Sequence, residues 1–126
     1  MNRTLSPAAP ADWTAGEPAI VFQRCAVCAH RWYFARSFCP RCGADEPAAE
    51  RAAGSGVVHA ITTVQRAPTD SLRAALPYTV ALVDCNEGFR MLAHAEAGLA
   101  VGDPVQAGFR TFDGGLVPFF RRHPTD

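Results

Sequence analysis

The stretch that decides the fold runs from Cys25 to Cys42 and reads CAVCAHRWYFARSFCPRC. It holds two Cys-x-x-Cys pairs with ten residues between them. Two residues between cysteines let both thiolates of one tight turn reach the same metal ion, and two such turns supply the four soft ligands of a tetrahedral zinc site. We therefore predict one structural Zn²⁺, bound by four cysteines: Cys25, Cys28, Cys39 and Cys42.

The second turn, Cys39-Pro40-Arg41-Cys42-Gly43, is the more specific of the two. Its proline fixes φ and its glycine permits a left-handed backbone, a geometry that directs backbone N–H groups at the sulfurs. The first turn lacks this glycine. Iron in a rubredoxin-like site would use similar turns, but nothing in the sequence indicates electron transfer. His30, two residues after Cys28, is not needed as a ligand beside four cysteines. Four arginines flank the turns and are expected to compensate the negative charge of the thiolates: Arg24, Arg31, Arg36 and Arg41.

The composition bounds the class of protein. The 126 residues suffice for one domain or two small ones, and 48% of them are apolar. No apolar run approaches the roughly 20 residues that span a bilayer, and the N-terminus has no apolar core of a secretory signal. We therefore expect a cytoplasmic protein without membrane spans. Twelve arginines balance twelve acidic residues without any lysine, which argues against non-specific coating of nucleic acid.

The chain divides into four segments by composition. Residues 1–18 are rich in proline and small residues and are expected to form a weakly ordered arm, in which Trp13 is the one large apolar anchor. Apolar runs on either side of the first cysteine pair predict a zinc ribbon over residues 19–46. Residues 47–56 form the expected connector, with one or two helical turns in the alanine- and glutamate-rich stretch 44–53. Residues 57–122 form the second domain.

This second domain reads as five short strands. Phe89, Met91, Ala93 and Ala95 alternate with polar residues, and residues 105–112 alternate in the same way. Hairpin turns are predicted at residues 86–88 and 113–115, and the proline at position 118 suggests a strand edge or end. Five strands in about 65 residues without long helices match an OB-fold in size. The predicted fold is mainly β: a rubredoxin-like zinc ribbon followed by a five-stranded OB-fold barrel.

The sequence offers little for catalysis. Cys85 has acidic neighbours instead of the base or positive field that activates a thiolate, so we interpret it as structural. His59 and His94 belong to no recognised catalytic motif. Several arginines lie on or beside the predicted barrel and are either solvated or part of an anion site, since their guanidinium forks suit phosphate. The candidate ligand-binding residues are Arg66, Arg73 and Arg90, with Arg110 beside them.

Five stretches together resemble a known family. They are residues 39–43 (CPRCG), 54–57 (GSGV), 77–84 (PYTVALVD), 87–90 (EGFR) and 101–105 (VGDPV). Their order is similar to that of the zinc-ribbon/OB-fold proteins associated with acyl-CoA metabolism, and the resemblance covers about residues 20–121. The cysteine pairs alone are common to many ribbons. The stretches at residues 77–84, 87–90 and 101–105 distinguish this family from other zinc-ribbon proteins.

The resemblance implies a non-catalytic accessory subunit that partners a thiolase-like enzyme acting on CoA thioesters, with acyl-CoA as a candidate ligand. It also implies that the four cysteines are the zinc ligands. Three aromatic residues beside the metal would offer a contact surface for the partner enzyme: Trp32, Tyr33 and Phe34. Trp13 in the N-terminal arm would either pack on the ribbon or dock on the partner. The alternative, from another functional class, is a protein that binds single-stranded nucleic acid through exposed phenylalanines of the barrel, namely Phe89, Phe109 and Phe112.

Overall fold

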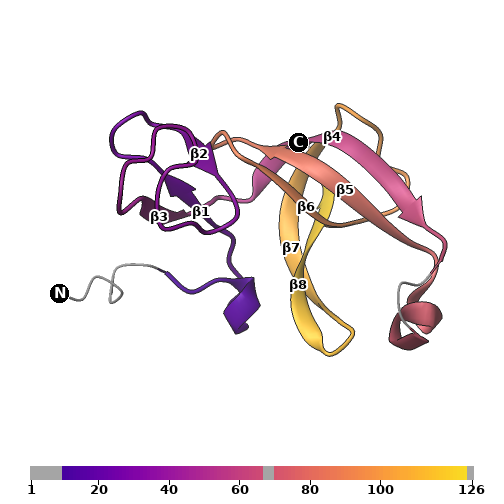
Figure 1. The fold of residues 1–126 in the computed structure, drawn as a ribbon. Coiled ribbons are helices and arrows are strands. Elements are labelled where there is room, and N and C mark those ends of the chain that lie inside the picture. The colour runs from indigo at the N-terminus through magenta and orange to yellow at the C-terminus, as the bar shows by residue number, and fades with distance from the viewer. Residues whose placement is uncertain (1–9, 67–69, 125–126) are drawn as a thin grey trace.

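The structure, a computed structural model, describes residues 10–66 and 70–124 (Figure 1). A small sheet in the order β2-β1-β3 carries the ribbon, and β4-β5-β6-β8-β7 form a closed barrel beside it. The fold is therefore mainly β, a zinc ribbon followed by a five-stranded barrel, as predicted. The elements are η2 (Trp13–Ala15), β1 (Val21–Arg24), β2 (Arg31–Trp32), β3 (Ala48–Arg51), β4 (Ser55–Val64), η3 (Asp70–Ala75), β5 (Tyr78–Cys85), β6 (Arg90–Ala95), β7 (Pro104–Phe112) and β8 (Gly115–Arg122).

The strand β3 corrects one prediction. Helical turns were expected over residues 44–53, but Ala48–Arg51 pair antiparallel with β1, with Phe22 opposite Glu50. The guanidinium of Arg24 on β1 lies 2.6 Å from the carboxylate of Glu50 on β3. Cross-strand pairing of this kind overrides the helix propensity of alanine and glutamate, which amounts to only a few tenths of a kcal/mol per residue, about 0.7 at most.

The alternation predicted for the barrel is confirmed. Met91, Ala93 and Ala95 are buried on the inner face of β6, and Phe89 just before the strand is buried with them. Pro118 lies within β8, opposite Phe109 of β7. The parallel pairing of β8 with β6 includes only the next two residues of β8. Pro118 therefore occupies a point where β8 has one strand partner, as the edge prediction requires.

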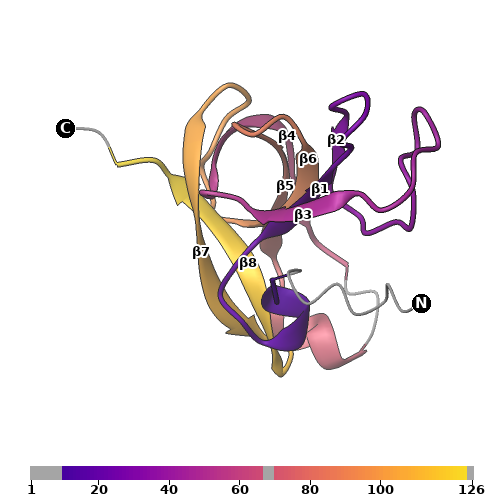
Figure 2. The same cartoon turned by 90° about the vertical axis from the view of Figure 1, so that its left-hand side faces the viewer.

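The ribbon and the barrel share a core. Ile20 and Phe22 from the ribbon belong to the same buried cluster as the inner faces of β5, β6 and β7. Phe89, at the end of the β5–β6 turn, stacks on Phe22 with ring centroids 4.8 Å apart and on Tyr33 with centroids 5.9 Å apart. These two stacks tie the barrel to the ribbon. Figure 2 shows the ribbon strands beside the barrel.

The described part of the N-terminal arm also contacts the body of the protein. Residues 1–9 of this arm lie outside the described residues. The short turn η2 is capped by Asp12, whose carboxylate accepts a hydrogen bond from the N–H of Thr14 at 3.0 Å. Trp13 donates its indole N–H to the hydroxyl of Tyr33 at 2.6 Å. Within the described part of the chain, no helix is long and apolar enough to span a membrane.

Candidate metal centre and its surroundings

Each of the two cysteine turns directs backbone N–H groups at its first sulfur. The Sγ of Cys25 accepts hydrogen bonds from the amides of Val27 at 3.3 Å and Cys28 at 3.4 Å. The Sγ of Cys39 accepts from the two equivalent amides of the second turn at the same distances. The N–H of Cys28 contributes most to lowering the pKa of the Cys25 thiol, which favours the thiolate form that binds metal.

The two turns reach the same backbone shape with different residues. Gly43 follows the second pair with φ 82°, in the left-handed region that glycine adopts readily. Ala29 occupies the equivalent position after the first pair with φ 65°. An L-residue pays about 1–2 kcal/mol for this conformation. The first turn therefore keeps the geometry of the second at the expense of local strain.

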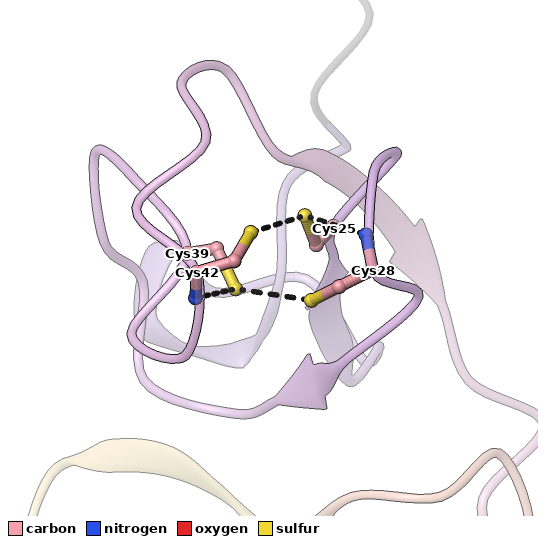
Figure 3. A group of neighbouring side chains, drawn as sticks. All are labelled: Cys25, Cys28, Cys39 and Cys42. Carbon is pink, nitrogen blue, oxygen red and sulfur yellow. Dashed lines mark hydrogen bonds between the residues drawn. The ribbon is translucent and has the colours of Figure 1, made fainter.

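The four sulfurs are arranged as zinc requires. Sγ of Cys25 lies 3.6 Å from that of Cys42, and Sγ of Cys28 lies 3.7 Å from that of Cys39 (Figure 3). All four sulfurs lie within 4.8 Å of one another. Zn–S bonds of about 2.3 Å in a tetrahedron give an S···S edge of about 3.8 Å. The cluster is able to bind a zinc ion, which would cross-link the two turns with all four positions filled by protein and none open for substrate.

Two of the flanking arginines have further contacts in the structure. Arg24 forms a salt bridge with Glu50. Arg31 lies against the β5–β6 turn, since a Cβ built on Gly88 would approach its Cδ to 3.5 Å. Arg31 lines a shallow depression of about 420 Å³ there together with Asp84 and Arg90. These two arginines thus serve the ribbon sheet and its junction with the barrel.

The aromatic residues beside the metal divide between core and surface. Trp32 is only 8% exposed, packs with Cys25 and Cys39, and donates its indole N–H to the side chain of Gln23 at 2.6 Å. Its predicted role as a contact surface is corrected, because the ribbon needs this ring for its own small core. Tyr33 is half-buried in the stack with Phe89. Phe34 is 76% exposed, and Val27 and Phe38 nearby in sequence are also exposed.

The candidate anion-binding arginines are not brought together. Arg73 pairs with Asp70 at 2.7 Å within η3. Arg90 donates hydrogen bonds from Nε and Nη2 to the carboxylate of Asp84, at 2.5 and 3.2 Å, and thereby lowers the pKa of that carboxyl. Arg66 is exposed just after β4. Two of the three guanidiniums are thus already neutralised by carboxylates.

The residues considered for catalysis remain unsuited to it. Cys85 is buried, and burial together with the charges of Glu87 and Asp84 raises its pKa to about 12. Its thiol is therefore not a nucleophile at neutral pH. His59 lies 3.5 Å from Asp84 on the outer surface of the barrel, with no described nucleophile beside it.

The fold and the cysteine cluster define the class: a zinc ribbon joined to an OB-type barrel. Residues 13–48 match the family model described as the ChsH2 rubredoxin-like zinc ribbon domain, and residues 49–110 match the ChsH2 C-terminal OB-fold domain. The chain carries both domains in this order and belongs to the ChsH2-type family of zinc-ribbon/OB-fold proteins.

Two curated relatives extend the comparison. A probable enoyl-CoA hydratase alpha subunit of Thermomonospora curvata is 32% identical over 107 residues, which are 81% of this chain and 33% of that protein. The chain thus spans about a third of that relative's length. A DUF35 domain-containing scaffold protein of Methanothermobacter thermautotrophicus is 28% identical over 92 residues, covering 69% of this chain and 68% of the relative.

Two solved structures share the fold. A chain of a structure described as the Ltp2-ChsH2(DUF35) aldolase superposes with a TM-score of 0.69 at 28% identity, over 82% of this chain and 84% of that one. A DUF35-family protein of unknown function from Sulfolobus solfataricus superposes with a TM-score of 0.56 at 18% identity, over 83% and 76%. The second likeness concerns the fold alone.

Proposed function

We propose that this chain is a non-catalytic accessory subunit that binds a thiolase-like enzyme and helps it act on CoA thioesters. The observation that carries the proposal is the likeness to a chain of the Ltp2-ChsH2(DUF35) aldolase, whose name joins a DUF35 chain to a second protein. The relative called a DUF35 domain-containing scaffold protein supports a role in assembly.

The chemistry of the described residues supports a non-catalytic role. The cysteine cluster has no open metal position, and the thiol of Cys85 is buried with a raised pKa. The side chains of His59, Asp84 and Arg90 bond to one another on an exposed face without a nucleophile. In such a complex this chain would provide a binding surface for the enzyme, and the enzyme would supply the catalytic residues.

The ribbon offers a surface for such a partner. Phe34 at 76% exposed and Val27 at 77% exposed are large apolar side chains left in solvent, and Phe38 is 54% exposed. Exposed aromatic residues of this kind are typical anchors of protein interfaces. Phe34 is therefore the member of the expected aromatic group that we assign to partner contact, with Trp13 and Tyr33 supporting it from within the junction.

Reconstitution tests the proposal. The tagged chain is purified from its native cells, and the thiolase-like enzyme that accompanies it is identified and produced separately. Turnover of acyl-CoA by that enzyme is then measured with and without the chain. We expect a stoichiometric complex and a change in kcat/KM that Phe34→Ala diminishes. Failure of every thiolase-like enzyme of the cell to bind, or turnover of acyl-CoA by the isolated chain, would exclude an accessory role.

The three phenylalanines expected to stack on bases of single-stranded nucleic acid have contacts within the protein. Phe89 is 4% exposed inside the ribbon–barrel junction, and Phe109 packs against the barrel core. Phe112 contacts Tyr78 and His94 edge-on, with centroids 5.2 and 4.2 Å away. Phe89 is therefore closed to a base, and Phe109 and Phe112 are partly occupied by contacts within the barrel, which weakens the case for stacking in the manner of single-strand binding proteins.

A further inference from the structure

Two arginines that the sequence did not group converge on one aromatic ring. The guanidinium carbon of Arg110 on β7 lies 4.1 Å from the ring centroid of Phe119, and that of Arg121 on β8 lies 5.2 Å from the same centroid. All three side chains alternate with inward-facing neighbours such as Phe109 and Phe120, so they share the outer face of the β7–β8 hairpin.

This pair of cations has no carboxylate partner among the described residues. The two carboxylates that contact the neighbouring Arg122 are already engaged: Asp103 bonds its guanidinium at 3.0 Å and Glu96 accepts from its backbone N–H at 2.8 Å. Arg110 and Arg121 form no salt bridge within the described ranges. Two like charges on one ring repel each other, and an anion placed between them would remove that repulsion.

A glycine lies on the same face as the two arginines. Gly108 occupies the outer-face position of β7 opposite Phe119, with Arg110 two residues further along the strand and Arg121 opposite Gln106. A Cβ built on Gly108 would meet only the main-chain oxygen of Phe119, at 3.8 Å. The absence of a side chain at this position therefore leaves the backbone of β7 accessible beside Arg110 and diagonally across from Arg121.

Arg110 is held in position before any ligand arrives. Its Nη2 lies 3.4 Å from Nδ1 of His94, which stacks on Tyr78 with ring planes 4° apart. Burial, and secondly the charge of Arg110, lower the pKa of His94, so its ring is neutral at pH 7 and accepts this bond. The Nε–H of Arg110 is enclosed and has no acceptor among the described residues. The guanidinium is thus fixed and incompletely hydrogen-bonded.

We propose that Arg110 and Arg121 form an oxyanion site over Gly108, which takes a phosphate or carboxylate group between the two guanidiniums that pack on the buried ring of Phe119. Planar guanidiniums bind both groups through paired N–H donors. The site lies on the barrel, apart from the exposed apolar residues of the ribbon, and stands whether or not the chain docks on a thiolase-like enzyme.

Titration followed by NMR tests the site on the full-length, zinc-loaded protein. Inorganic phosphate and succinate are added in separate series at constant ionic strength, and the amide of Gly108 and the Nε of both arginines are followed. We expect saturable shifts at these atoms. We also expect Arg121→Gln and Arg110→Gln each to raise the dissociation constant at least tenfold. Arg122→Gln, the matched control, should leave it within twofold, because Arg122 is paired with Asp103.

A second variant covers the backbone at Gly108 and keeps both charges. Gly108→Val adds a side chain whose Cβ would make only an ordinary contact, 3.8 Å from the main-chain oxygen of Phe119, and the φ of Gly108 is not in the left-handed region. We expect it to abolish the saturable shifts while the remaining spectrum stays folded. A response to phosphate alone would assign the site to phosphate esters, and a response to succinate alone would assign it to carboxylates. The absence of a saturable shift with either anion would overturn the site. An equal loss of anion affinity in Arg122→Gln and Arg121→Gln would also overturn it. Because Arg121 is exposed, its variant keeps the test valid if Arg110→Gln does not fold.

Discussion

Replacing Phe89 by alanine tests whether the ribbon and the barrel fold as one unit. Phe89 is 4% exposed and stacks on Phe22 and Tyr33, with interplanar angles of 12° and 11°. Removal of a buried phenylalanine side chain costs about 3–5 kcal/mol, in which each stacked aromatic pair accounts for about 0.5–1.5 kcal/mol. Since Phe89 has two stacked partners and is nearly fully buried, we expect a loss of about 4 kcal/mol in the free energy of unfolding.

Urea denaturation of the zinc-loaded protein, followed by two signals, measures this loss. Trp13 and Trp32 both lie in or beside the ribbon, so tryptophan fluorescence reports on that part, whereas far-ultraviolet circular dichroism is dominated by the longer barrel strands. In the parent protein we expect the two transitions to coincide, because one core cluster contains residues of both parts. In Phe89→Ala the fluorescence transition should move to lower urea than the dichroism transition.

The control is the same substitution at Phe34, which is 76% exposed. Phe34 keeps one ring contact, with the half-buried Tyr33 at 5.4 Å between centroids, so its removal should lower the free energy of unfolding by about 1 kcal/mol at most. Equal effects of Phe89→Ala and Phe34→Ala on stability would refute the reasoning. Separate transitions in the parent protein would also refute it, because they would show that the shared core does not couple the two parts.

Four further substitutions address the metal centre and the barrel surface. Cys39→Ser removes one of four zinc ligands and should lower zinc affinity more than about 100-fold, measured by competition with a chromogenic chelator; retained zinc would contradict the assignment. Ala29→Gly relieves the strain of the left-handed backbone and should raise the free energy of unfolding by about 1 kcal/mol. Gly43→Ala introduces the same strain and should lower the free energy of unfolding by about as much. If calorimetry shows that both variants change this free energy in the same direction, the strain argument is wrong. Arg90 lowers the pKa of Asp84, so the stability that this carboxylate adds is present above its ordinary pKa and is lost as the pH falls through the lowered value; Asp84→Asn should remove this acid-side decline, and an unchanged pH profile would contradict it.

The features that the sequence predicted correctly are local or strictly periodic. Cysteine spacing sets a local turn, so the cluster of four sulfurs followed from the two pairs alone. Alternation along a strand assigns each side chain to one face, which is why the buried residues of β6 could be named in advance. The predicted turns at residues 86–88 and 113–115 depend on asparagine, aspartate and glycine, whose backbone preferences act over only a few residues.

The features that the sequence missed depend on which strands become neighbours. Glu50 lies on a strand because β1 pairs with it. The residues around Glu50 are mostly alanine and glutamate, which favour a helix, so the local sequence does not predict this strand. The convergence of Arg110 and Arg121 follows from the register between β7 and β8, which a single sequence does not contain. Trp32 looked available because its neighbours Tyr33 and Phe34 are aromatic too. Its burial follows from packing against the sulfur cluster.

The shared core changes what the zinc site does for the molecule. The ribbon strands are 4, 2 and 4 residues long, and their own buried cluster contains little besides Trp32 and two of the cysteines. Strands this short cannot hold a stable sheet by themselves, so the ribbon needs both the metal and the barrel core into which it places Ile20 and Phe22. Loss of zinc should therefore loosen the packing around Phe89 and the inner face of β6 as well as the turns that carry the cysteines. In turn, we expect the position of Phe34 relative to the barrel to be fixed more firmly when the metal is bound. A partner that contacts both parts would then bind the zinc-loaded chain more tightly than the zinc-free chain, and comparing its affinity for these two forms measures that coupling directly.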